Sequence, residues 1–353
     1  MDYNIHLITG LSGGGAEHLV LDLSERAKKE GKKVLVISVT DNNEIQKKFE
    51  ALDITTAYLN INSFSSLKTG ISKAQGLLKP FGANAVVHCH MFHAVFIAMA
   101  LKLLGNSLNI VFTLHNNSVD SLIRRWILFL TKPLRCKDVV FSNRGKKWYL
   151  KSPSLLPNGI NLSKFKKSFE VNTTDPKVFK FMVLGSLTTQ KNPLIVPEIT
   201  KKMVALGHTN FKFIFIGHGP LEAALKTKIT ALQVENFIEL LGFRSDVPEL
   251  LPQFHAQVMP SLWEGMPISI LESGAVGLPV VTTPVGSIPD FLDKHTGYLT
   301  TLEDFHTTLI HVMEKYTEAI EKSINFKNKV WKEFDIEVVY RDHQKLYSSC
   351  ISN

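Results

Sequence analysis

The sequence predicts an α/β protein made of two doubly wound parallel sheets, one in each half of the chain. Short apolar runs alternate with stretches of helical periodicity, beginning with Asn4–Thr9, Gly14–Glu30 and Val34–Val39. Strands that alternate with helices indicate a parallel sheet, and a continuous apolar run indicates a strand buried on both faces. A chain of 353 residues is longer than one hydrophobic core usually organises. We therefore expect two Rossmann-like domains.

The first domain is expected to continue this alternation until a turn signal at Asn158-Gly159. The polar residues 166–177, which include Pro176, are predicted to form the linker. These boundaries place the first domain at residues 1–165 and the second at residues 166–335. The further strands of the first domain are predicted at residues 54–59, 84–89, 109–114 and 138–141.

The second half repeats the pattern and then ends in amphipathic helices, predicted at residues 302–323 and 336–349. Its strands are predicted at residues 179–184, 211–216, 237–240 and 279–282 and around Val258. Its other helices are predicted at residues 193–206, 220–232 and 269–276.

Composition favours a globular protein of a reducing compartment. Hydrophobic residues make up 44% of the chain and charged residues 20%. Cys89, Cys136 and Cys350 lie far apart and form no CxxC pair, which argues against a disulfide framework. The N-terminus lacks the basic region and apolar core of a signal peptide, and no apolar run approaches the ~20 residues that span a bilayer. We expect a cytoplasmic protein.

The positive charge is concentrated in the first half. Residues 1–165 carry 21 Lys and Arg against 11 Asp and Glu, a net charge of +10, whereas residues 166–353 carry 19 against 21, a net charge of −2. A basic half suits an anionic lipid surface, a phosphorylated acceptor or nucleic acid, and a solvated basic surface explains it equally well. The sequence shows no nucleic-acid recognition module, so we expect no nucleic-acid partner.

Glycine-rich loops follow predicted strands in both halves. Gly10 to Gly15 precedes a helix, where free N–H groups suit a diphosphate. The spacing is neither G-x-G-x-x-G nor a Walker A loop, which disfavours an NAD-dependent dehydrogenase. In the second half, Lys191 ends a strand-to-helix loop that begins at Gly185, and Gly217 follows the next strand. We predict that Lys191 binds phosphate. The alternatives are packing turns and a solvated lysine.

Two glutamates stand at the start of a predicted helix, in the segment Glu264-Gly-Met-Pro-Ile-Ser-Ile-Leu-Glu272. Carboxylates accept hydrogen bonds from sugar hydroxyls, and the N–H groups of Gly265 and Met266 suit phosphate. Pro267 is tolerated at an early helical position. We predict a sugar-binding and phosphate-binding segment. The alternative is a glutamate that only complements the helix dipole.

The histidines His88 and His90 flank a strand end and form a His-x-His pair. Such a pair can bind metal, but no carboxylate or thiolate stands at ligand spacing as a third ligand. The sequence also has no Asp-x-Asp motif to hold a metal-bound diphosphate. We therefore expect no metal and no other cofactor. One of the two histidines could instead be a buried, hydrogen-bonded residue of the core.

Over nearly its whole length the sequence resembles the retaining glycosyltransferases of family 4, which have the GT-B fold. The resemblance rests on segments that occur in the family's order. They are Gly13-Gly14-Gly15-Ala-Glu17, Val86-Val87-His88-Cys-His90, Phe112-Thr-Leu-His115-Asn, Leu156-Pro-Asn158-Gly159-Ile, Val183-Leu-Gly185-Ser-Leu, Phe215-Ile-Gly217-His-Gly219, Leu241-Gly242-Phe243-Arg244, Pro260-Ser-Leu-Trp263-Glu264-Gly-Met-Pro and Gly277-Leu-Pro279.

The resemblance implies a nucleotide-sugar site in a cleft between the domains. It assigns catalysis to His115, Glu264 and Lys191, with Glu264 on the donor sugar, Lys191 on the diphosphate and His115 at the reaction centre. It places Glu272 on the ribose and the residues of 242–244 beside the base. The implied donor-binding set is Gly14, Gly15, Ser186, Gly217, Gly242, Phe243, Arg244, Gly265, Met266, Pro267 and Glu272. The implied acceptor-side set is His88, His90 and His93.

The implied reaction moves a sugar, with retention, from a UDP- or GDP-linked donor to a glycan or polyprenyl-diphosphate-linked glycan in surface polysaccharide or lipopolysaccharide synthesis. The resemblance also implies that the helix from Ile336 crosses back onto the first domain. The sequence departs from the family at Ser186, where many members have arginine, and at Gly286-Ser287, where a Gly-Gly pair is usual. The alternatives are a nucleotide-sugar epimerase of the same architecture and an inactive partner subunit.

A basic, apolar segment of the first domain suggests contact with the inner face of the cytoplasmic membrane. Arg124, Arg125, Lys132, Arg135 and Lys137 surround the apolar run Trp126–Leu130. A basic amphipathic helix with an aromatic residue can lie on an anionic bilayer. The alternative is a core helix with basic edges.

Overall fold

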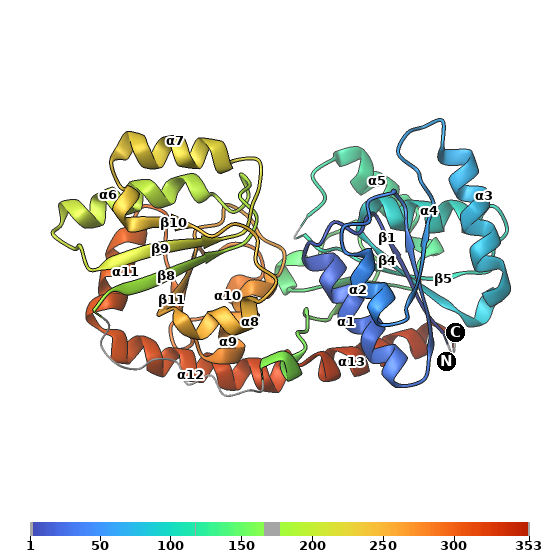
Figure 1. The fold of residues 1–353 in the computed structure, drawn as a ribbon. Helices are drawn as coiled ribbons and strands as arrows, with labels where there is room; N and C mark the ends of the chain where they lie inside the picture. The colour runs from blue at the N-terminus through green and yellow to red at the C-terminus, as the bar shows by residue number, and fades with distance from the viewer. Residues whose placement is uncertain (1–2, 117, 166–176, 352–353) are drawn as a thin grey trace. The chain divides into compact units, whose positions relative to one another are not determined.

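The structure, a computed structural model, describes residues 3–116, 118–165 and 177–351. The chain divides into two compact units, the first made of Met1–Ile160 with Ile336–Asn353 and the second of Asn161–Asp335. Each unit is built on one parallel sheet with helices packed on it (Figure 1). None of the helices in the described ranges combines the length and the apolarity needed to cross a bilayer.

The sheet of the first unit has seven parallel strands in the order β3-β2-β1-β4-β5-β6-β7. Ile5 pairs with Val87 and Ile8 with His90, so β1 and β4 are neighbours although β2 and β3 lie between them in sequence. The chain therefore leaves β1 toward one edge of the sheet and continues from β4 toward the other. The strands are β1 (Tyr3–Ile8), β2 (Lys33–Ser38), β3 (Thr55–Tyr58), β4 (Val86–His90), β5 (Asn109–Thr113), β6 (Lys137–Val140) and β7 (Ser154–Leu155).

Helices cover both faces of this sheet because alternate strand residues point to opposite sides. On one face, Leu7 and Phe112 belong to the main core together with residues of α4. On the other face, Val111 packs with Tyr347 of α13, so the C-terminal helix returns to the first unit as predicted. The helices are α1 (Gly15–Lys29), α2 (Gln46–Ala51), α3 (Leu67–Leu78), α4 (Met91–Leu103), α5 (Leu122–Leu130) and α13 (Ile336–Ile351).

The sheet of the second unit has six parallel strands in the order β10-β9-β8-β11-β12-β13. Aromatic residues fill its core, where the rings of Phe181 and Phe213 stack with centroids 5.0 Å apart. The strands are β8 (Phe179–Leu184), β9 (Phe211–Ile216), β10 (Ile238–Leu240), β11 (Ala256–Met259), β12 (Val280–Thr282) and β13 (Tyr298–Leu299). The helices are α6 (Val196–Ala205), α7 (Glu222–Leu232), α8 (Val247–Leu250), α9 (Ile268–Val276), α10 (Ile288–Phe291), α11 (Phe305–Glu314) and α12 (Tyr316–Glu333).

The structure differs from the predicted elements in the C-terminal third. The single helix expected at 302–323 is two helices, α11 and α12, because the backbone at Lys315 leaves helical geometry. Helix α12 then continues to Glu333, since its residues pack on α9. The packing is close at Gly274, where an added Cβ would lie 2.6 Å from Phe326 Cε1.

The boundary between the units falls after Ile160, five residues before the predicted end of the first domain. The reason is the short 3-10 helix Leu162–Phe165, which packs against α9 of the second unit. The predicted linker at 166–177 lies outside the described residues except for Lys177.

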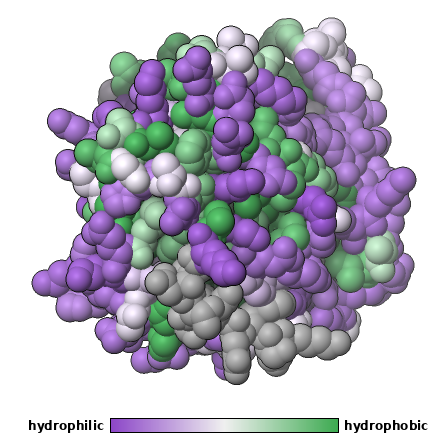
Figure 2. Space-filling model, turned by 60° about the vertical axis from the view of Figure 1, so that its left-hand side comes forward, coloured by the Kyte–Doolittle hydropathy of each residue, from purple (hydrophilic) through white to green (hydrophobic). Residues whose placement is uncertain are grey.

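On the face drawn in Figure 2, hydrophilic residues form most of the periphery, and hydrophobic side chains gather toward the centre. Exposed hydrophobic residues are normal when scattered singly and informative when grouped. A group of this kind lies on α5, where Ile123 is 74% exposed and Leu130 is 70% exposed.

A buried ion pair fixes the region that carries α5. Arg135 Nε and Nη2 donate to the two carboxylate oxygens of Asp138 at 2.8 and 2.9 Å. Arg135 Nη1 also donates to the carbonyl oxygen of Leu128 at 2.9 Å, at the C-terminal end of α5. Arg135 and Asp138 are both fully buried. A buried charge of this kind is tolerated because every polar contact is made within the protein.

Replacing Arg135 with Met is expected to destabilise the first unit by about 3–5 kcal/mol, because it leaves the Asp138 carboxylate buried without its cation. The free energy of unfolding, measured in urea, checks this. Lys137→Met, on the partly exposed neighbouring residue, is the control and is expected to change stability by less than about 0.5 kcal/mol. Equal effects of the two substitutions would contradict the prediction.

Candidate active site

In the second unit, two loops flank the point where the strand order reverses. Strand β8 lies between β9 and β11, and the chain moves from β8 to β9 on one side and later enters β11 on the other. Open parallel sheets bind ligands outside the carboxyl ends of their strands at such a switch point. Lys191 lies on the loop after β8, and Glu264 lies on the loop after β11. The fold therefore brings both predicted residues to one place.

Lys191 and Glu264 form an ion pair, with Nζ 2.7 Å from Oε1. Ser261 Oγ donates to the same oxygen at 2.7 Å, and Gln190 Nε2 donates to Oε2 at 3.2 Å. The Glu264 side chain is 5% exposed and that of Lys191 is 21% exposed. A buried carboxylate requires such partners, and here they fix its orientation. The sequence analysis did not identify Ser261 and Gln190, because their role depends on a tertiary contact.

The loop after β12 supports the Glu264 loop. Ser287 donates both its hydroxyl, at 2.7 Å, and its backbone N–H, at 3.0 Å, to the carbonyl oxygen of Gly265. At Gly286 the backbone has a φ of 65°, and a Cβ would lie 2.3 Å from the carbonyl oxygen of Glu264. This segment departs from the family pattern in sequence, and Ser287 makes a hydrogen bond there that a glycine side chain could not make.

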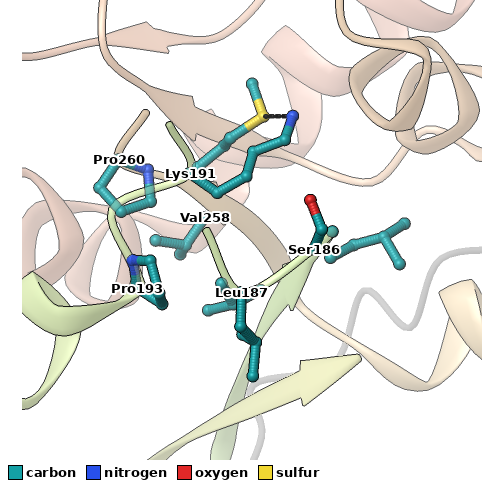
Figure 3. A pocket seen from close by; sticks show the side chains of 10 residues that line it. Ser186, Leu187, Lys191, Pro193, Val258 and Pro260 are labelled. Carbon is teal, nitrogen blue, oxygen red and sulfur yellow. Dashed lines mark hydrogen bonds between the residues drawn. The ribbon is translucent and has the colours of Figure 1, made fainter. Parts of the chain in front are cut away.

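A pocket lies beside Lys191 and is lined by residues of β8, the loop after it and β11 (Figure 3). Lys191 Nζ lies 3.9 Å from Met259 Sδ, and Ser186 lines the same pocket. The next loop packs tightly on this one, since a Cβ at Gly217 would lie 2.0 Å from the carbonyl oxygen of Gly185. Backbone packing therefore requires Gly217 to be glycine, and its contact with the donor stays a prediction.

The residues predicted to contact the base lie on the loop after β10. Phe243 follows Gly242 and is 66% exposed. Its ring is edge-on to that of His218, with the ring centroids 5.8 Å apart. The guanidinium of Arg244 forms an ion pair with Asp246 at the surface, with Nε 2.7 Å from Oδ1. An exposed aromatic ring beside a sheet edge offers a surface on which a base can stack.

The segment around α9 holds the other predicted donor residues. Glu272 is partly buried in the second turn of α9. Gly265, Met266 and Pro267 are buried just before the helix, whose first turn has no side-chain cap. The uncapped first turn leaves a positive helix end next to the Lys191–Glu264 pair.

In the first unit, the glycine loop follows β1 at the corresponding switch point between β1 and β4. Gly14 and Gly15 are exposed at the start of α1. Glu17 is buried, accepts a hydrogen bond from Ser12 Oγ at 3.0 Å, and places Oε2 2.9 Å from where a Cβ of Gly14 would be. Its carboxylate thus supplies negative charge at the helix N-terminus. Contact between this loop and a diphosphate stays a prediction.

Histidines meet at the same junction of β1 and β4. His90 is hydrogen-bonded at both ring nitrogens, Nδ1 to His115 Nε2 at 3.0 Å and Nε2 to His6 Nδ1 at 3.1 Å. The ring of His88 lies beside that of His90, with centroids 4.1 Å apart. The structure therefore brings His88, His90 and His115 together. It adds His6, which the sequence analysis did not single out.

His93 lies apart from this cluster. It is exposed on α4, where its ring is edge-on to Phe92 and its Nε2 lies 3.4 Å from Arg124 Nη2. The reason is helical geometry, because His93 follows the strand end by three residues and turns with α4 toward α5. Its predicted place on the acceptor side remains untested.

Burial keeps the clustered histidines neutral. Desolvation lowers the pKa of His6 and of His115 to about 3, with the nearby His343 as a second cause. Desolvation also lowers the pKa values of His88 and His90 well below the usual range. A neutral imidazole donates from one nitrogen and accepts at the other, so these rings act near pH 7 as hydrogen-bonding groups.

Three of the histidines, His6, His88 and His90, have nitrogens within 4.8 Å of one another, which is close enough to share a metal ion. His88, however, already uses both nitrogens. Its Nδ1 lies 2.6 Å from Tyr347 Oη, and its Nε2 lies 2.6 Å from Thr113 Oγ1. A metal would have to displace one of these short hydrogen bonds. The described geometry therefore fits hydrogen-bonded imidazoles better than metal ligands.

Two family models match the chain, one in each unit. The model described as Glycosyltransferase Family 4 matches residues 13–164, and the model described as Glycosyl transferases group 1 matches residues 179–318. Together with the relatives below, they show that the chain belongs to the family 4-type glycosyltransferases and is an enzyme of the hexosyltransferase class. The predicted family is confirmed.

The chain is similar to curated glycosyltransferases. It is 27% identical over 330 residues to the UDP-Gal:alpha-D-GlcNAc-diphosphoundecaprenol alpha-1,3-galactosyltransferase of Escherichia coli, covering 86% of this chain and 84% of the relative. It is 27% identical over 195 residues to the amylovoran biosynthesis glycosyltransferase AmsK of Erwinia amylovora, covering 52% and 47% of the two chains.

Solved structures share the fold at low sequence identity. HepE of Anabaena, in complex with UDP and glucose, superposes with a TM-score of 0.83 at 17% identity, covering 99% of this chain and 100% of the other. Sucrose-phosphate synthase of Thermosynechococcus elongatus superposes with a TM-score of 0.82 at 16% identity over the whole of both chains. The predicted α/β fold with two Rossmann-like domains is confirmed.

The buried histidines make stability depend on acidity. A histidine that is neutral in the folded state and cationic in the unfolded state lowers the free energy of unfolding as the pH falls below its unfolded pKa. The loss is up to about 1.4 kcal/mol per pH unit for each such histidine. Unfolding free energy is therefore expected to fall steadily as the pH drops below about 6.5. His343, fully buried with a lowered pKa, is one contributor. Urea titrations at several pH values between 7 and 5 measure the slope.

The variant His343→Asn is expected to make that slope shallower, because it removes one group that takes up a proton on unfolding. Asparagine can still donate to the carbonyl oxygen of Val339, which lies 2.8 Å from His343 Nδ1. His295→Asn, at an exposed position, is the matched control and is expected to leave the slope unchanged. A slope that neither variant alters would show that His343 does not contribute.

Proposed function

We propose that this enzyme transfers a hexose from a UDP-linked donor, with retention of anomeric configuration, to a glycan carried on a lipid diphosphate in polysaccharide biosynthesis. The observation that carries the proposal is the Lys191–Glu264 pair, held at the switch point of the second sheet beside the first turn of α9. The E. coli relative, named for a UDP-galactose donor and a diphosphoundecaprenol-linked acceptor, supports the donor and acceptor classes. The HepE complex with UDP and glucose supports a uridine nucleotide.

Charge explains how the second unit would hold the donor. A sugar nucleotide carries a diphosphate, and its β-phosphate becomes the leaving group when the sugar departs. Lys191 and the N-terminal turn of α9 supply positive charge at one place, and such preorganised charge stabilises a developing anion. Glu264, oriented by Lys191 and Ser261, would accept hydrogen bonds from hydroxyls of the donor sugar. Glu272 would accept hydrogen bonds from the ribose.

The proposed chemistry requires no separate general base. The departing phosphate oxygen accepts the proton of the acceptor hydroxyl on the same face of the sugar, so the new bond keeps the configuration of the old one. The neutral ring of His115 would hydrogen-bond the donor sugar at the reaction centre. The residues assigned to catalysis then act through orientation and charge, with no metal in the reaction.

Two alternatives predict different products. A nucleotide-sugar epimerase would convert the donor without an acceptor, and an inactive partner subunit would bind the nucleotide without converting it. Product analysis of the donor, with and without acceptor, separates the three. Glu264 is buried and its carboxylate oxygens are hydrogen-bonded. Burial of a carboxylate costs folding free energy, so its presence at this position favours a carboxylate that takes part in the reaction, and therefore an active enzyme.

Replacing Glu272 with Ala is expected to weaken UDP binding roughly 10- to 100-fold, because charge-assisted hydrogen bonds contribute about 1.5–3 kcal/mol. Isothermal titration calorimetry with UDP measures this, and titrations with GDP and ADP test the choice of base. Glu303→Ala, at an exposed position of the same unit, is the control. Equal UDP affinity of the two variants would refute the ribose assignment, and tighter binding of GDP would refute the uridine assignment.

Replacing Glu264 with Gln is expected to lower kcat by about 10²-fold or more, because the neutral amide cannot reproduce the oriented carboxylate. Mass spectrometry of a lipid-diphosphate-linked N-acetylglucosamine acceptor, incubated with UDP-hexoses, measures transfer. NMR of the product gives the anomeric configuration. Glu239→Gln, on exposed residue 239 of β10, is the control. Transfer by Glu264→Gln at the wild-type rate, or inversion of the anomeric centre, would contradict the proposal.

We further propose that α5 attaches the first unit to an anionic membrane surface. Leu128 is the one fully buried residue of α5, and most of its other side chains are exposed, which supports a surface position for this helix. The ring centroids of Trp126 and Trp148 lie 5.1 Å apart, and both residues are about half exposed. Lys132 Nζ lies 4.7 Å from the ring centre of Phe129. Apolar and aromatic residues with basic neighbours suit the interface of an anionic bilayer.

The double variant Ile123→Ser/Trp126→Ser is expected to bind vesicles at least about tenfold more weakly, because burial of one such side chain contributes about 1.5–3 kcal/mol. Flotation with vesicles containing phosphatidylglycerol measures the bound fraction, and vesicles of phosphatidylcholine alone test the need for anionic lipid. Leu206→Ser removes a similarly exposed apolar residue from the second unit. Equal flotation of the double variant and Leu206→Ser would contradict the proposal.

A further inference from the structure

Two cysteines from distant parts of the sequence lie side by side in the first unit. Cys136 stands just before β6, where its backbone N–H donates to the carbonyl oxygen of Ile110 at 2.8 Å. Cys350 lies in the last turn of α13. Cys136 packs against the buried cluster to which Cys350 belongs, and the thiol of Cys350 is hydrogen-bonded to the sulfur of Cys136. Both cysteines are free thiols.

The surroundings of Cys136 favour its thiolate. Lys151 Nζ donates to the carbonyl oxygen of Arg135, the residue before Cys136, and so holds a cation beside it. The hydrogen bond from Cys350 lowers the pKa of Cys136 to about 6, and the positive charges of Lys102 and Lys151 act in the same direction. The thiolate is the nucleophilic form of cysteine, so Cys136 is set up to react at neutral pH.

The three cysteines differ in their access to solvent. Cys136 is partly exposed, whereas Cys350 is 7% exposed and Cys89 is fully buried. The hydrogen bond to Cys136, together with burial, raises the pKa of Cys350, so this residue keeps its proton. Burial raises the pKa of Cys89. An oxidant from solvent therefore meets an accessible thiolate first, with a second thiol already beside it, which is the arrangement of a redox-sensitive pair.

We propose that Cys136 and Cys350 form a reversible oxidation site that takes a peroxide as its oxidant. The Cys136 sulfur attacks one peroxide oxygen, the O–O bond breaks, and the other oxygen takes up a proton and leaves. Cys136 is then a sulfenic acid. The Cys350 sulfur next attacks the Cys136 sulfur, the S–O bond breaks, and the hydroxyl leaves as water with the Cys350 proton. Two electrons pass from the two sulfurs to the peroxide, and the product is a disulfide.

The disulfide would fasten the end of α13 to the sheet. Helix ends open more easily than helix centres. In the last turn of α13, Ser348 and Ser349 are exposed, and Cys350 is the buried residue that holds the turn on the sheet. A reducing compartment keeps the pair as thiols, and an oxidant would turn this apolar contact into a covalent one. The inference goes beyond the proposed function, because neither cysteine belongs to the candidate active site.

The experiment treats the reduced full-length chain with an equimolar amount of hydrogen peroxide at pH 7. Free thiols are then blocked with N-ethylmaleimide, and chymotryptic peptides are analysed by mass spectrometry without reductant. We expect one linked peptide pair, Cys136 with Cys350, in the wild type and in the control Cys89→Ser, and its loss after dithiothreitol. In Cys350→Ala, dimedone should trap the sulfenic acid of Cys136. In Cys136→Ser, thiols should be lost at least about tenfold more slowly.

Hydrogen exchange measures the consequence for the helix. Backbone amides in the last turn of α13 are expected to exchange about tenfold more slowly in the oxidised wild type than in the reduced one. The same treatment of Cys136→Ser is expected to leave their exchange unchanged, because no link can form.

A wild type that keeps both thiols, or that is linked through Cys89 or between two molecules, would overturn the disulfide. Loss of thiols from Cys136→Ser at the wild-type rate would overturn Cys136 as the residue that reacts first. Formation of the link without slower exchange would overturn the fastening of α13. The peptide analysis of the wild type needs no variant, so it decides on the disulfide even where a substituted chain fails to fold.

Discussion

The internal architecture of each unit depends on the hydrogen bonding of its parallel strands. In a parallel sheet all strands end at the same edge, so every loop that follows a strand is presented there. Where the strand order reverses, the two central loops diverge and leave room between them. The pairs β1–β4 and β8–β11 are these points. Lys191 and Glu264 lie on loops of the second pair, and His90 ends a strand of the first, so each sheet gathers the candidate side chains of its own unit.

The two units bury polar groups at their switch points in different ways. In the second unit, Glu264 is charged and is balanced by Lys191 and hydroxyl and amide donors. In the first unit, His6, His90 and His115 lose their charge and form a chain of neutral rings. Both solutions leave little freedom of orientation, because each polar atom in a dry interior needs its partner. A charged pair such as Lys191 and Glu264 suits a phosphate and sugar hydroxyls. A neutral imidazole suits a single directional hydrogen bond from its N–H group to one oxygen.

Sequence periodicity predicted most strands and the positions of Lys191 and Glu264, because these follow from local pattern and from the motif order. It did not predict β7 and β13, which have two residues each and too little apolar pattern to detect. The break at Lys315 was also missed, since the apolar periodicity continues across it. Contacts such as that of Ser287 with Gly265 join segments far apart in sequence, and no local signal reports them.

The two departures from the family pattern have different physical consequences. Ser287 acts on a backbone oxygen that a neighbouring loop presents, so it adds support to the Glu264 segment without changing its charge. Ser186 lines the pocket beside Lys191 with a hydroxyl where an arginine would add a positive charge. When a diphosphate binds in the proposed function, the single charge of Lys191 must balance both Glu264 and the phosphates. The backbone N–H groups in the N-terminal turn of α9 supply the remaining positive potential on that side of the sheet. They would therefore neutralise a larger share of the phosphate charge than in a site that also has an arginine.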